Sequence, residues 1–166
     1  MNPQYGEGFA GHGAESAHIN TVLGLRDGPV GTAWATALAS PSPGHVPFVV
    51  VHSPNLPVVP FTLFVNKATI SSDLHGILTW GAAQAGVAAG VTDALRLGLF
   101  DVADPLNALA LLAAVWVNPH AQIEERVFAN NRNATVEAIA MGRLGGPDPV
   151  ALLAVGEPTN PFFRLT

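Results

Sequence analysis

An apolar stretch from Pro54 to Ile70, PNLPVVPFTLFVNKATI, constrains the fold most, because it holds the only lysine of the chain, Lys67, at the end of an apolar strand. Successive side chains of an extended strand alternate between its faces, so Lys67 and Thr69 are predicted to project on the same side as Phe61. Composition alone favours a solvated lysine at an exposed strand end, where it discourages edge-to-edge pairing. The alternative is an ammonium group that serves a binding site.

Three further segments have the character of strands. Residues 17–25 alternate, which places His18 and Asn20 beside each other on one face. His45–Ser53, HVPFVVVHS, is rich in β-branched residues and predicts a central strand covered on both faces. Residues 108–117, ALALLAAVWV, predict another buried strand, although alanine and leucine would also suit a helix. The glycine-rich first dozen residues are expected to be irregular.

Helices are predicted between these strands, because residues that cap and residues that end helices occur there. Asp27 is expected to cap a helix with Pro29 in its first turn, and residues 71–73 to cap a helix that breaks at Gly81. The next helix, about residues 82–97, carries Gln84 on its apolar stripe, and its ridge of small residues, Ala82, Gly86 and Gly90, predicts close packing on another backbone. The last helix is expected to open at Asn118–Pro119 and to stop after Arg143 at a Gly-Gly-Pro sequence.

This order of elements predicts an α/β (α+β two-layer) fold, a mixed sheet with helices packed on one side. We expect residues 1–166 to form a single domain with a core of about residues 6–146 and a proline-broken tail, residues 147–166.

Composition narrows the possible partners. Only 11% of residues are charged, against a usual level of about 25%, which favours a homo-oligomer that hides part of each subunit. The uncharged runs 74–92 and 105–123 are interrupted by polar residues and glycines, so no membrane span is predicted and a cytoplasmic location is expected. A net charge of −5 and the lack of a basic cluster argue against nucleic acid, and the absence of cysteine excludes thiol chemistry.

Common short catalytic motifs are absent: the sequence contains no phosphate loop, GxGxxG, HExxH or GxSxG. The six histidines show no ligand spacing, so a metal site formed by His12, His18 and His52 is disfavoured. The polar residues that remain as candidates are His18, Asn20, Lys67, Thr69 and Gln84. Periodicity alone does not show that they converge.

Four segments in this order, GEGFAGHGAESAHIN, HSPNLP, FVNKATI and GAAQAGVA, resemble the formaldehyde-activating enzyme family. The resemblance covers about residues 6–146. It implies condensation of formaldehyde with tetrahydromethanopterin to methylene-tetrahydromethanopterin and water, a hydro-lyase reaction of one-carbon metabolism or formaldehyde detoxification. It also implies a fold similar to domain 2 of ribosomal protein S5 and a homopentamer that binds the pterin between neighbouring subunits.

The resemblance also assigns roles to residues. It implies that His18 is the proton donor and that the pterin is contacted by Asn20, Val49, Lys67, Thr69 and Gln84. Two positions depart from the family pattern, which has aspartate in place of Asn20 and usually leucine in place of Val49. The resemblance implies no metal and no covalent cofactor, since the reduced pterin is a co-substrate. Some members carry a fused sugar-phosphate aldolase domain, which this sequence is not expected to contain.

The departures at Asn20 and Val49 keep a second interpretation open. A non-catalytic paralogue could retain the site only to bind or sense the pterin or formaldehyde. Acceleration of methylene-pterin formation would distinguish the enzyme from such a binding protein.

Overall fold

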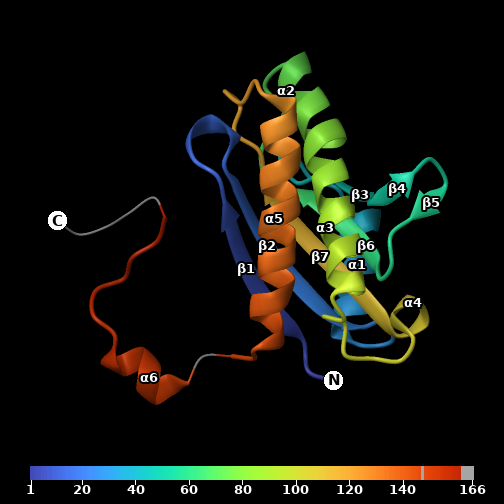
Figure 1. The fold of residues 1–166 in the computed structure, drawn as a ribbon. Coiled ribbons are helices and arrows are strands. Elements are labelled where there is room, and N and C mark those ends of the chain that lie inside the picture. Colours follow the sequence, from blue (N-terminus) through green and yellow to red (C-terminus); the bar gives the residue numbers. More distant parts are fainter. Residues whose placement is uncertain (147, 162–166) are drawn as a thin grey trace.

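The computed structural model describes residues 1–146 and 148–161, and its centre is a five-stranded sheet with the strand order β1-β2-β7-β6-β3 (Figure 1). Neighbouring strands run antiparallel, except for the parallel pair β6 and β7. The strands are β1 (Gln4–Ala10), β2 (Ala17–Leu25), β3 (Pro47–Val49), β6 (Phe61–Asn66) and β7 (Leu109–Trp116), and a small hairpin comprises β4 (Val51–Ser53) and β5 (Leu56–Pro57). The helices are α1 (Pro29–Ala39), α2 (Asp73–Ile77), α3 (Gln84–Arg96), α4 (Pro105–Ala108), α5 (Glu124–Arg143) and α6 (Pro149–Ala154).

The main core lies between one face of the sheet and the two long helices α3 and α5 (Figure 1). Alternation along β2 directs Ile19 and Leu23 into this layer, where both are buried. The small-residue ridge of α3 packs as predicted: a Cβ atom added at Gly86 would lie 2.5 Å from the carbonyl oxygen of Phe128 in α5. The predicted mixed sheet with helices packed on one side is therefore confirmed.

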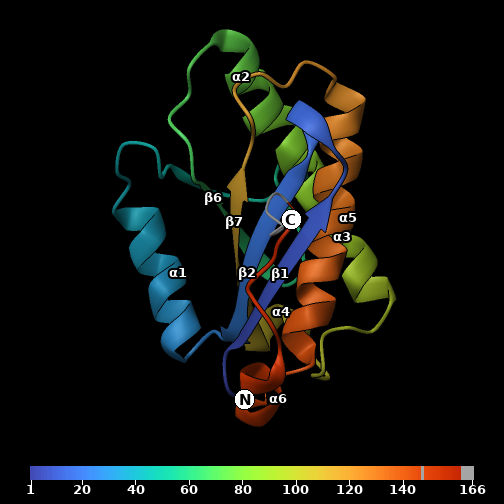
Figure 2. The same cartoon turned by 90° about the vertical axis from the view of Figure 1, so that its left-hand side faces the viewer.

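The opposite face of the sheet, which we call the open face, is only partly covered. Helix α1 packs over one end of it, where Val30 lies against Gly24 and Leu63 is fully buried (Figure 2). The other end of this face carries the side chains of His18 and Asn20, which alternation directs away from the main core. This end, free of α1, is where three of the polar candidates, His18, Asn20 and Lys67, gather.

Strand β1 was not anticipated, because the first dozen residues were expected to be irregular. Its glycines have a packing role: a Cβ atom at Gly6 or Gly8 would lie 1.8 Å or 2.1 Å from a carbonyl oxygen of α5. Glycine inside a strand often marks such a close approach of two backbones. As a result, Glu7, between the two glycines, projects onto the open face beside β2.

The prediction for His45–Ser53 was wrong in position. The segment is split into β3 and β4, and β3 lies at the edge of the sheet. The chain turns away after Val50, whose carbonyl oxygen accepts a hydrogen bond from the N–H of Val58. A run of β-branched residues predicts extended backbone, but it does not decide which strands lie on either side.

Several helix ends also differ from the predictions. Gly28, not Asp27, is the N-cap of α1, and α5 begins at Glu124 and not at Asn118–Pro119. Ser72 caps α2 as expected by accepting a hydrogen bond from the N–H of His75. The predicted break at Gly81 is instead a π-helical turn, Leu78–Ala83, which joins α2 to α3 without interruption.

The strand predictions for residues 17–25 and 108–117 are confirmed by β2 and β7, and the last helix ends at Arg143 as predicted. The tail, expected to be broken by prolines, contains α6, and the part of that prediction on Pro147 and residues 162–166 lies outside the described residues. Within residues 1–146 and 148–161, no helix has the length and apolar character needed to cross a membrane.

Candidate active site

His18 is held by two neighbours from β1. Its Nε2 atom lies 2.8 Å from Oε1 of Glu7, and its ring stacks on Phe9 with the ring centroids 4.2 Å apart and the planes 14° from parallel. The antiparallel register places Phe9 directly opposite His18 and Glu7 opposite Asn20. The side chain of His18 is still 29% exposed, so a ligand can reach it from the open face.

Asn20 connects this histidine to the lysine. Its Oδ1 atom accepts a hydrogen bond of 2.9 Å from Nζ of Lys67, and its Nδ2 atom donates a longer one, 3.4 Å, to Oε1 of Glu7. An amide side chain can bridge a cation and an anion in this way because it has both a donor and an acceptor. The polar side chains therefore form one chain, Lys67–Asn20–Glu7–His18.

Lys67 follows directly after β6, where its own N–H donates to the carbonyl oxygen of Val115 in β7. Burial lowers the pKa of Lys67, and the negative charge of Glu7 opposes part of that shift. The interpretation of Lys67 as a solvated residue that blocks edge pairing is wrong, because β6 lies between β7 and β3 and the ammonium group is half-buried and hydrogen-bonded.

The other predicted site residues lie apart from this chain of side chains. Thr69 is exposed and lies beside Gly44, beyond the end of β6. Val49 pairs with Leu63, four residues before Lys67, which corresponds to about 13 Å along the strand. Gln84 belongs to α3, which covers the opposite face of the sheet.

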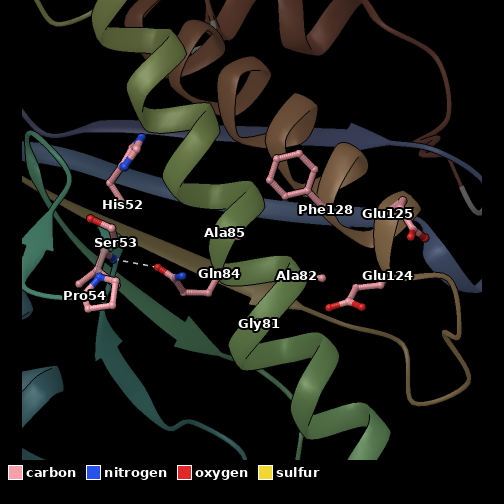
Figure 3. Close-up of a pocket in the computed structure, with 11 residues that line it drawn as sticks. His52, Ser53, Pro54, Gly81, Ala82, Gln84, Ala85, Glu124, Glu125 and Phe128 are labelled. Atoms are coloured by element: carbon pink, nitrogen blue, oxygen red, sulfur yellow. Dashed lines mark hydrogen bonds between the residues drawn. The ribbon is translucent and has the colours of Figure 1, made fainter.

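Gln84 lines a separate pocket of about 570 Å³ at the edge of the sheet (Figure 3). Its Oε1 atom accepts a hydrogen bond of 2.8 Å from the N–H of Val51, as expected for a partly buried amide. Glu124, Glu125 and Phe128 approach this pocket from α5, and His52, Ser53 and Pro54 from the β4–β5 hairpin (Figure 3). One chain therefore presents two separate candidate surfaces.

The described residues contain no cluster of three or more His, Cys, Asp or Glu side chains that could hold a metal ion. His18 is instead paired with a carboxylate, and His52 lies in the pocket near Gln84. At the open face, the structure offers an accessible imidazole that can transfer a proton, joined through Glu7 and Asn20 to a half-buried ammonium group.

Sequence reasoning missed Glu7 and Phe9, the two residues that contact the imidazole of His18. The signal was present in the segment GEGFA, where glycines alternate with larger residues at a spacing of two. This pattern fits a strand with one face pressed against a helix, which would have placed Glu7 and Phe9 together on the other face.

Comparison with known proteins shows the family of the chain. Residues 5–160 match the family described as formaldehyde-activating enzyme (Fae). The chain belongs to the formaldehyde-activating enzyme family. The resemblance inferred from the four sequence segments is thereby confirmed, and the family is one of enzymes.

Two similar proteins come from Methanosarcina barkeri and Methanoculleus marisnigri. The chain is 37% identical over 145 residues to a "Bifunctional enzyme Fae/Hps" of Methanosarcina barkeri, and 35% identical over 148 residues to a protein of the same name from Methanoculleus marisnigri. These alignments cover 87% and 89% of this chain but only 37% of each relative. The chain thus spans a little over a third of the length of these curated relatives.

Proposed function

We propose that this protein condenses formaldehyde with a reduced pterin, tetrahydromethanopterin, to the methylene derivative and water, in one-carbon metabolism or formaldehyde detoxification in the cytoplasm. Membership of the formaldehyde-activating enzyme family supports the reaction. The observation that assigns the reaction to particular residues is the accessible imidazole of His18, which Glu7 and Phe9 hold and which Glu7 and Asn20 link to the ammonium group of Lys67.

The reaction needs an acid at one step. A secondary amine of the pterin adds to the carbonyl carbon of formaldehyde, and the carbinolamine that forms must lose its oxygen as water. His18 in its protonated form donates the proton to that hydroxyl group, the C–O bond breaks, and an iminium ion remains. A second pterin nitrogen then attacks the iminium carbon and releases a proton, which restores the acid. Proton donation by a positioned side chain is typically worth about 10²- to 10⁴-fold in rate.

The remaining site residues bind the pterin in this proposal. Lys67, Asn20 and Thr69 contact it on the side of His18, Val49 supplies an apolar contact, and Gln84 donates from its amide. Holding the amine and the aldehyde in reacting geometry supplies the rest of the acceleration.

We further propose that the complete site is shared between two copies of the chain. Lys67 lies on the open face of the sheet, whereas Gln84 lies in the pocket beside α3 and α5, so one pterin reaches both groups most directly between neighbouring subunits. A closed homo-oligomer, a pentamer by family resemblance, would repeat this contact around a ring. The mixed sheet with α3 and α5 on one face is compatible with the fold of ribosomal protein S5 domain 2.

A stopped-flow assay of methylene-pterin formation, with and without protein, tests the proposal, because the reaction also proceeds uncatalysed. We expect acceleration over the spontaneous rate. His18→Ala should remove most of it and leave the affinity for the pterin within a few-fold, because His18 acts in the transition state. Lys67→Ala should raise KM before it lowers kcat. Equal losses of binding and turnover in His18→Ala would make His18 an anchor and not the acid.

The second candidate is a non-catalytic paralogue that binds or senses the pterin or formaldehyde. The observation that favours it is Asn20, whose amide oxygen already engages the ammonium group of Lys67 at a position where an acidic residue is expected from the family resemblance. Binding of the pterin with no acceleration in the same assay would support this function.

A further inference from the structure

We infer that Glu7 is the positioning residue of His18 and that Nδ1 of His18 is the nitrogen that faces the substrate. The inference rests on the proposed function, since it specifies how the acid is held. Glu7 is the carboxylate nearest to the ring, with 2.8 Å between its Oε1 and Nε2 of His18. A carboxylate of this kind accepts a hydrogen bond from Nε2–H and fixes which nitrogen carries the proton in the neutral ring.

Two contacts hold the ring in this orientation. Phe9 stacks on it with nearly parallel planes, so a quarter turn about the Cβ–Cγ bond would break the stacking, and a half turn would break the hydrogen bond to Glu7. Among the described residues, Nδ1 makes no hydrogen bond, which leaves it as the nitrogen that can reach a ligand. In the protonated ring, the Nδ1–H group is then the donor to the carbinolamine hydroxyl.

Glu7 is itself fixed from two directions. Asn20 donates to the same carboxylate oxygen and ties it to Lys67, and β1 is pressed against α5 through Gly6 and Gly8. The backbone of β1 and the side chains of β2 therefore determine the place of the carboxylate together. A ligand that contacts Lys67 would also act on His18 through this chain of hydrogen bonds.

The test determines which ring nitrogen of neutral His18 carries the proton. Two-bond ¹H–¹⁵N correlation spectra at alkaline pH give this tautomer, and the peaks of His18 are identified by their loss in His18→Asn. We expect the Nε2–H tautomer in the unmodified protein and a mixture of both tautomers in Glu7→Gln, because a glutamine amide can donate as well as accept. Glu15→Gln is the matched control: it makes the same change of charge in the β1–β2 connection, where the carboxylate of Glu15 accepts a hydrogen bond from the backbone N–H of Gln122. An Nδ1–H tautomer in the unmodified protein, or an unchanged tautomer in Glu7→Gln, would overturn the assignment.

Kinetics give a second readout that a purely structural role would not move. We expect Glu7→Gln to lower kcat about tenfold or more with KM nearly unchanged, and Glu15→Gln to leave both unchanged. If the protein accelerates the condensation but Glu7→Gln keeps full kcat, Glu7 has no positioning role, and the proposed function stands. If the protein does not accelerate the condensation, the proposed function fails, and the tautomer still decides whether Glu7 fixes the ring.

Discussion

The contact between α3 and α5 allows the effect of a single methyl group to be predicted from the structure. In Gly86→Ala, the new Cβ atom would lie 2.5 Å from the carbonyl oxygen of Phe128 and 3.1 Å from the backbone nitrogen of Arg132. Both are backbone atoms of α5, so no side chain can turn aside and the two helices must separate. Overpacking of this kind costs about 1 to 3 kcal/mol. Alanine also raises helix propensity by about 1 kcal/mol, which offsets part of that cost.

Gly81→Ala is the matched control, because Gly81 lies in the helical turn just before α3 and a Cβ atom there would have no neighbour within 4 Å. We expect urea denaturation to show a loss of about 1 to 2 kcal/mol in the free energy of unfolding for Gly86→Ala and a gain of up to about 1 kcal/mol for Gly81→Ala. Equal effects of the two substitutions would refute the argument that the close approach of α5, and not helix propensity, determines the residue at position 86.

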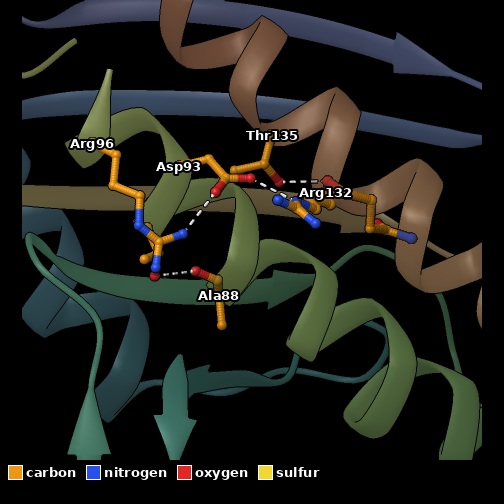
Figure 4. A network of polar contacts seen from close by, with 7 residues as sticks. Ala88, Asp93, Arg96, Arg132 and Thr135 are labelled. Atoms are coloured by element: carbon orange, nitrogen blue, oxygen red, sulfur yellow. Dashed lines mark hydrogen bonds and ion pairs between the residues drawn. The ribbon is translucent and has the colours of Figure 1, made fainter. Parts of the chain in front are cut away.

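Three further predictions concern charge and assembly. Burial lowers the pKa of Lys67, so the folded protein releases this proton at a lower pH than the unfolded chain, which titrates near 10.5. The free energy of unfolding should therefore rise with pH in the alkaline range just below 10.5, and Lys67→Met should lose this rise in denaturation midpoints measured at a series of pH values up to 10.5. Asp93 accepts hydrogen bonds from Arg132 and Arg96 (Figure 4), and these contacts lower the pKa of its carboxyl group below 3.8. The ionised carboxylate therefore stabilises the fold above pH 3.8, and this contribution should disappear as the pH falls through the lowered pKa. Asp93→Asn should accordingly show a flatter acid-unfolding profile. Native mass spectrometry at micromolar concentration should show a closed homo-oligomer, most simply a pentamer, and a monomer alone would contradict the shared-site proposal.

The segments whose pattern is strictly local were predicted well. Strand β2 has the predicted bounds because its side chains alternate without interruption, and Ser72 caps α2 because a cap depends only on the next few residues. The small-residue ridge of α3 also indicated a close backbone neighbour before that neighbour, α5, was known. In the site, the shared strand face of His18 and Asn20 followed from a period of two.

Predictions failed where a distant segment determined the outcome. His45–Ser53 was expected in the centre of the sheet, but strand order depends on which segments pair across the whole chain. Glycines at the start of the chain were taken as a sign of irregular backbone, whereas Gly6 and Gly8 accommodate carbonyl oxygens of α5 more than 120 residues away. The roles assigned to Val49, Thr69 and Gln84 stay predictions, because no ligand is present to test them.

The sequence by itself determined the two-layer class of fold, the family and the identity of the acid candidate, because these depend on local periodicity and on motifs that keep their order and spacing. Only the tertiary structure decided that Glu7 and Phe9 hold His18, that Asn20 joins Glu7 to Lys67, and that Gln84 lies across the sheet. The physical reason is that strand register and helix packing bring together residues far apart in the chain. A shift of the register by a single residue would break hydrogen bonds of about 3 Å.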